Sequence, residues 1–157
     1  MSEVTANSMK RILLLVCVAI FTIGPTSRVY SAMQEPFVTD DVMTGQVRIG
    51  PGQCKMFQFE VDANRMRAAR IVGRFEAAGG GGNDIEVVIA EQDEFLNWFS
   101  NHGGKIIYNS GKRTTGTLDV QISSSGTYVV AFSNKFSAIS AKTVSGNILI
   151  AYLPTGR

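Results

Sequence analysis

Few side chains in this sequence could carry out catalysis. His102 is the only histidine among the 157 residues and lies in the glycine-rich stretch NHGG. A Ser–His–Asp triad needs a nucleophile presented beside that histidine, and the chain contains no G-x-S-x-G motif. A Cys54–His102 pair is conceivable, but Cys54 begins an apolar segment, where a buried cysteine is more common. We therefore expect no catalytic residues and a protein that is not an enzyme.

Metal and cofactor sites are equally hard to assemble. One histidine and Cys54 cannot form a zinc site without carboxylates. The acidic group Glu91, Asp93 and Glu94 offers oxygen atoms that calcium could use, but the D-x-[DN]-x-[DN]-G pattern is absent, and we expect a solvated loop. The run Gly79–Gly82 is not followed by the Lys-Ser/Thr of a phosphate-binding loop. The sequence predicts neither a metal nor a cofactor.

Aromatic residues are the best candidates for binding a ligand or partner. They fall in one short window and comprise Phe95, Trp98, Phe99, His102 and Tyr108. Exposed aromatic faces in a loop stack on sugars or anchor a protein partner. The alternative is that Phe95 and Phe99 close one end of the core, and Trp98 is the residue that we most expect at the surface. We expect 91–99 to be a loop, with a short helix as the alternative.

The N-terminus has the order of a signal peptide. Lys10 and Arg11 precede an apolar run over residues 12–23, which Gly24 and Pro25 end. A helix that crosses a bilayer needs about 20 residues, so the run is short. We expect a signal peptide at 1–31, a secreted or periplasmic protein, and only transient contact with a membrane. An uncleaved N-terminal anchor is the alternative.

Removal of that segment changes the charge and the cysteine count. Residues 1–31 hold three of the 15 basic and one of the 13 acidic residues, so the remainder has no net charge and nucleic acid is not an expected partner. Cys54 is then an unpaired thiol. Four arginines still cluster, and they form either a solvated rim or a site for an anion: Arg65, Arg67, Arg70 and Arg74.

Short segments with period-two alternation fill the rest of the chain. Seven or eight of them at this spacing predict an all-β fold, an antiparallel β-sandwich or jelly-roll-like domain. We expect a domain over 46–154 after an extension at 32–45. The clearest strands are 54–61, 70–75, 85–90, 106–108, 118–122, 127–133 and 147–153.

Three segments resemble the GOLD domain of the emp24/p24 family. That family carries a signature like S-G-x-Y-x-x-C-F-S-N-x-F-S followed by K-x-V. This chain supplies Ser125, Gly126, Tyr128, Phe132, Ser133, Asn134, Phe136, Ser137, Lys142 and Val144. The glycine run before Asp84 and Ile85 resembles the family's G-G-x-x-D-I, and Gly52–Val61 resembles its first cysteine-containing strand. The resemblance covers residues 46–152.

The resemblance implies a sandwich that mediates protein contacts, in a family that sorts cargo in the early secretory pathway. Its members add a coiled coil, a membrane helix and a cytosolic tail, which we do not expect here. The family's disulfide implies that Cys54 and Ala131 lie on neighbouring strands at near-disulfide distance, with Ala131 replacing the second cysteine. We expect an unknown protein partner, with a homo-oligomer left open. A carbohydrate-binding or pre-peptidase-like module that uses the aromatic window 95–108 is the alternative.

Overall fold

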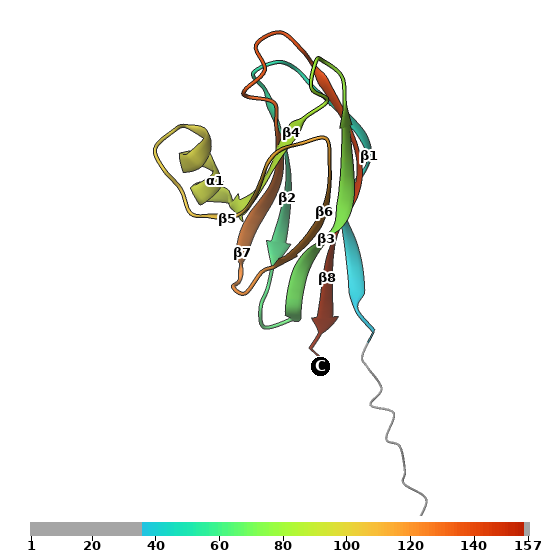
Figure 1. Cartoon of the computed structure of the whole chain (residues 1–157). Helices are drawn as coiled ribbons and strands as arrows, with labels where there is room; N and C mark the ends of the chain where they lie inside the picture. The colour runs from blue at the N-terminus through green and yellow to red at the C-terminus, as the bar shows by residue number, and fades with distance from the viewer. Residues whose placement is uncertain (1–35, 156–157) are drawn as a thin grey trace, which may run out of the picture. The chain divides into compact units, whose positions relative to one another are not determined.

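Two antiparallel four-stranded sheets face each other in the computed structural model, which describes residues 36–155 (Figure 1). The first sheet has the order β1-β8-β3-β6 and consists of Val38–Ile49, Lys142–Pro154, Met66–Ala78 and Thr115–Gln121. The second has the order β2-β7-β4-β5 and consists of Cys54–Val61, Gly126–Ser133, Ile85–Glu91 and Ile106–Arg113. The predicted all-β sandwich is therefore confirmed. Within 36–155 no helix is long and apolar enough to cross a membrane.

The layer between the sheets is built from alternate residues of each strand. In β7 the side chains of Tyr128, Val130 and Phe132 point into this layer and are nearly inaccessible to solvent. The ring of Phe132 makes edge contacts with Phe57 on its own sheet and with Phe75 on the opposite sheet, with centroids 6.0 and 6.1 Å apart. Such aromatic contacts add to the free energy gained from burial. They join the two sheets at the centre of the domain.

A second apolar layer covers the outer face of the β2-β7-β4-β5 sheet. Val88 and Ala90 of β4 and Val129 and Ala131 of β7 point outward and are buried. The helix α1, Gln92–Phe99, lies over them outside the sandwich (Figure 1). This second contact explains why β4 and β7 read as continuous apolar runs, since both of their faces are covered.

The structure differs from the sequence prediction at two elements. β1 begins at Val38, inside the segment 32–45 that we expected as an extension, and it pairs with β8 along its length. Residues 92–99 form a helix, the alternative that the sequence left open for this segment. The expected signal peptide at 1–31 lies outside the described residues.

Polar residues of the family-like motif close one end of the sandwich. The buried amide of Asn134 donates from Nδ2 to the carbonyls of Gly50 (3.0 Å) and Ser140 (2.8 Å), as Asn does at strand ends. Lys142 is 3% exposed, and its Nζ lies 3.2 Å from Oδ1 of Asp84. The contacts of Asn134 fasten the chain before β2 to the crossover between β7 and β8, and Lys142 fastens the glycine-rich loop to the start of β8.

The register of β2 and β7 corrects the expected position of the family's disulfide. Both strands are neighbours, as predicted, but Cys54 lies opposite Ser133, and the residue opposite Ala131 is Met56. Cys54 and Ala131 are therefore diagonal neighbours. Directly opposed Cα atoms are typically ~4.5–5.5 Å apart, whereas diagonal pairs are ~7–8 Å apart. The residue directly opposite Ala131 is Met56, two residues after the Cys54 that the family resemblance implied.

This register predicts which engineered pair can form a disulfide. In a chain whose own cysteines are replaced by Ser, Met56→Cys with Ala131→Cys should close on oxidation, because directly opposed positions match disulfide geometry. The bridge should stabilise the domain by up to about 4 kcal/mol, measured by denaturant unfolding with and without reductant. Ala131→Cys beside the native Cys54 should retain free thiols. Closure of the diagonal pair in preference to the direct pair would show that the register is different.

Candidate interaction surface

The short helix α1 is held in place by the turn that follows it. Asp93 and Glu94 lie in its first turn, where carboxylates interact favourably with the helix dipole. Glu94 Oε2 also accepts a hydrogen bond from the backbone of Lys105 at 2.6 Å. A Cβ at Gly104 would overlap the Glu94 carbonyl oxygen, so only glycine allows this loop to pack against the helix. The helix and its return loop thus form one unit on the sheet.

The structure brings together only part of the aromatic set. Phe95 is 1% exposed and anchors α1, with its ring 5.7 Å from Trp98 and 5.9 Å from Phe99. Trp98 and Phe99 are half-buried beside it, so Trp98 is less exposed than the sequence suggested. His102 is exposed in the turn after the helix. Tyr108 points from β5 into the layer between the sheets, away from the others.

An apolar groove runs between α1 and the edge strand β2. Its volume is about 160 Å³, and it is lined by Cys54, Met56, Phe95, Leu96 and Phe99. Met56 and Leu96 are 47% and 45% exposed, which is unusual for large apolar side chains. Two exposed apolar residues flanking a groove are the kind of feature that marks protein contact sites. We call this feature the α1–β2 surface. The sequence did not single out Met56 or Leu96. Met56 lies on the face of β2 opposite to Phe57, Phe59 and Val61, and Leu96 lies in a segment that was expected to be a loop.

A second pocket, more polar, lies at the C-terminal end of α1. It has a volume of about 260 Å³ and is lined by Glu86, Trp98, Asn101, Lys135 and Phe136. Lys135 Nζ donates to the Phe99 carbonyl at 2.6 Å and to Asn101 Oδ1 at 3.2 Å. Of the predicted aromatic window, only Trp98 reaches this pocket.

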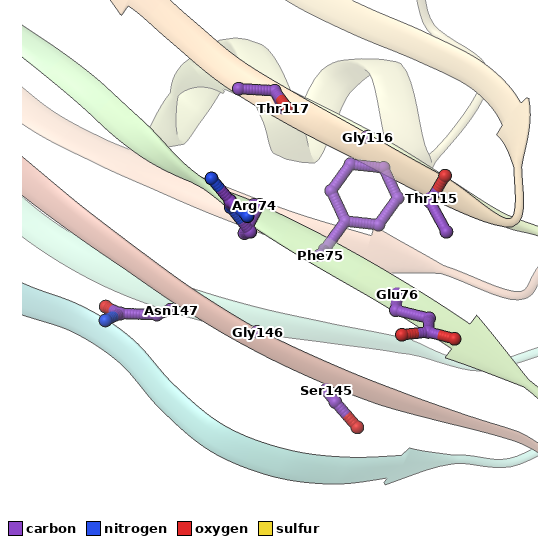
Figure 2. A pocket seen from close by; sticks show the side chains of 9 residues that line it. All are labelled: Arg74, Phe75, Glu76, Thr115, Gly116, Thr117, Ser145, Gly146 and Asn147. Carbon is purple, nitrogen blue, oxygen red and sulfur yellow. The ribbon is translucent and has the colours of Figure 1, made fainter.

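A further hollow lies on the outer face of the other sheet, and Arg74 is the one residue of its lining that the sequence analysis named. It measures about 530 Å³ and crosses β8, β3 and β6 (Figure 2). Phe75 lies between Gly146 and Gly116 in the pairing, and its ring fills the space in which a Gly116 Cβ would lie. The outer face at Gly146, Phe75 and Gly116 therefore carries no side chain and exposes backbone to solvent. Outward polar side chains such as Arg74 and Glu76 flank it. The hollow is a consequence of packing Phe75 inward.

The arginine cluster is divided between different contacts. Arg70 forms an ion pair with Asp119, with 2.7 Å between Nη2 and Oδ1. Arg74 lines the hollow above Phe75, and Arg65 lines a separate pocket beside Tyr152. The pair with Asp119 neutralises Arg70, so these arginines do not present one undivided basic site.

The environment of Cys54 opposes a nucleophilic role. Cys54 is a free thiol, and burial raises its pKa from 9.0 to about 12, with a further increase from the carboxylate of Glu86 and an opposing effect of Lys135. A reactive cysteine needs a lowered pKa, because the thiolate is the nucleophile. Within 36–155 no group of three or more His, Cys, Asp or Glu side chains converges on a possible metal position.

The raised pKa makes a test of Cys54 possible. In a Cys17→Ser chain at pH 8, we expect alkylation of folded Cys54 to be about a thousandfold slower than in denaturant, since three pH units separate the pKa values. The folded state holds the thiol proton more tightly. The stability contributed by this group is therefore complete below pH 9 and is lost as the pH rises from about 9 to about 12. Equal labelling rates in the folded and denatured chains would contradict this burial.

These features define the class of fold: an antiparallel β-sandwich with an exposed apolar groove beside its one described helix. The emp24/gp25L/p24 family/GOLD model matches residues 46–152, and the chain belongs to that family. It is also similar to the transmembrane emp24 domain-containing protein A of Dictyostelium discoideum, with 34% identity over 71 residues. That match covers 45% of this chain and 30% of the relative, so the chain spans well under two thirds of the relative's length.

Proposed function

We propose that this chain is an extracytoplasmic interaction domain that binds another protein through the α1–β2 surface. The observation that carries the proposal is the exposure of Met56 and Leu96 on opposite sides of an apolar groove. Burying two such side chains against a partner removes apolar surface from water, which lowers the free energy by ~25 cal/mol for each Å² buried. Membership of the emp24/p24 family supports a role in contacts between proteins of the secretory pathway.

The position of the surface suits this role. The groove lies beside β2, the edge strand of its sheet, so a partner can approach it without displacing another strand of the described domain. Phe95 packs on the outer face of the sheet and fixes α1 there, so the exposed side chain of Leu96 is held on a rigid support. Binding then costs little conformational entropy, which favours affinity.

The proposal is tested by recovering partners from native cells with tagged full-length chains. We expect Leu96→Asp to reduce the recovery of the specific partner at least about tenfold, since truncation at the centre of an interface has effects of this size. Ile139→Asp is the matched control, because Ile139 is 90% exposed and lies outside the groove. Equal recovery by the Leu96 and Ile139 variants would exclude the α1–β2 surface as the contact.

A further inference from the structure

We infer that the polar pocket at the end of α1 is a binding site for one pyranose ring of a neutral carbohydrate. The pocket is separate from the α1–β2 groove, and the two share no lining residue. Its volume of about 260 Å³ corresponds to roughly eight or nine waters at ~30 Å³ each. This space can hold a single sugar unit.

The walls provide apolar faces. Trp98 comes from α1 and Phe136 from the β7–β8 crossover, and both side chains are half-buried. Half-buried aromatic rings hold a fixed orientation while keeping accessible surface, which suits stacking on the C–H face of a sugar ring. The two rings come from segments far apart in the sequence.

The remaining lining residues provide both hydrogen-bond donors and acceptors. Lys135 carries three N–H donors, of which two are directed to Phe99 and Asn101, so one remains for a ligand. Glu86 accepts from Asn109 at Oε1 (2.9 Å) and keeps its other oxygen. A hydroxyl group both donates and accepts, so adjacent hydroxyls of a sugar can bridge an ammonium and a carboxylate. Hydrogen bonds to charged groups are also the stronger ones.

The charges argue against an ionic ligand. Glu86 and Lys135 line the pocket with opposite charges, so an anion and a cation each meet one repulsive group. The Phe136 ring already has the ammonium of Lys112 4.3 Å from its centroid, and Phe99 has that of Lys135 at 4.8 Å. The Phe136 ring therefore already has a cation of the chain over it, and a cationic ligand would gain little from that ring. A neutral ligand with an apolar face and several hydroxyls fits the whole set best.

Intrinsic fluorescence provides the test, because Trp98 is the only tryptophan of the chain. The full chain is titrated with methyl glycosides of glucose, galactose, mannose and N-acetylglucosamine, and with acetate and methylammonium as ionic probes. We expect at least one glycoside to change Trp98 emission with a dissociation constant near the millimolar range, and no saturable response to either ion.

Variants separate binding from a general effect on the fold. Lys135→Met, Glu86→Gln and Phe136→Ala should each weaken glycoside binding about tenfold or more, with unfolding still cooperative. Lys55→Met and Phe37→Ala, which change exposed residues outside the pocket, should leave binding unchanged. A saturable response to an ion alone, the absence of any glycoside response, or equal binding by all variants would overturn the inference.

Discussion

Phe95→Ala is expected to lower the free energy of unfolding by about 3 kcal/mol or more, the range for truncating a buried Phe. Phe95 is 1% exposed and contacts the outward residues of β4 and β7, while its ring packs on Trp98 and Phe99. An eight-residue helix is not stable alone in water, so α1 depends on this contact. Hydrogen exchange should show that residues 92–99 lose protection before β7 does.

Leu96→Ala is the matched control for Phe95→Ala. Leu96 is the next residue on the same helix but is 45% exposed, so its truncation should cost less than about 1 kcal/mol. Both variants keep helix propensity, because each introduces alanine. Similar losses of stability from the two variants, measured by urea unfolding, would show that Phe95 does not anchor the helix.

Asp84→Ala is expected to destabilise the fold by about 3 kcal/mol. Lys142 is 3% exposed, and Asp84 is the acid that pairs with it. Removing one partner leaves a buried ammonium without its counter-charge, which costs ~3–5 kcal/mol; the lower end applies because Asp84 is 28% exposed. Replacing both residues by apolar ones is much less costly, because no unpaired charge remains.

A double-mutant cycle measures this coupling. Asp84→Ala, Lys142→Met and the double variant are compared by urea unfolding. We expect the double variant to be more stable than Asp84→Ala alone, with a coupling energy above about 1 kcal/mol. Arg70→Met with Asp119→Ala is the control pair, since both of its members are exposed and such pairs contribute ~1 kcal/mol or less. Additive effects at Asp84 and Lys142 would mean that the pair contributes no specific stability.

The fold could be predicted because most strands carry their own signal. Cys54–Val61 was expected with the bounds that the structure shows, since Phe57, Phe59 and Val61 alternate with polar residues. β1 was missed because Asp40, Asp41 and Gly45 break its pattern. That segment is a strand because β8 pairs with it, and pairing with a neighbour overrides a weak local preference.

The candidate sites were harder to predict because they depend on which residues from different elements lie side by side in the fold. The sequence placed five aromatic residues in one window, but Tyr108 packs from β5 into the layer between the sheets, whereas Phe95 packs from α1 onto the outer face of the same sheet. The second pocket combines β4, α1 and the β7–β8 crossover, and no motif joins Glu86, Trp98 and Phe136. The position of Cys54 relative to Ala131 depends on the register of β2 and β7. A sequence motif does not determine that register to within two residues.

Photo-crosslinking from α1 tests the central claim most directly. A photoreactive phenylalanine analogue replaces Leu96 in one full-length chain and Ile139 in another, and both are expressed in native cells, irradiated and analysed by mass spectrometry. Both positions are exposed, but only Leu96 lines the α1–β2 surface. We expect a discrete protein adduct from position 96 and none from position 139. The same adducts from both positions, or adducts from position 139 alone, would contradict the proposal that this surface binds a protein partner.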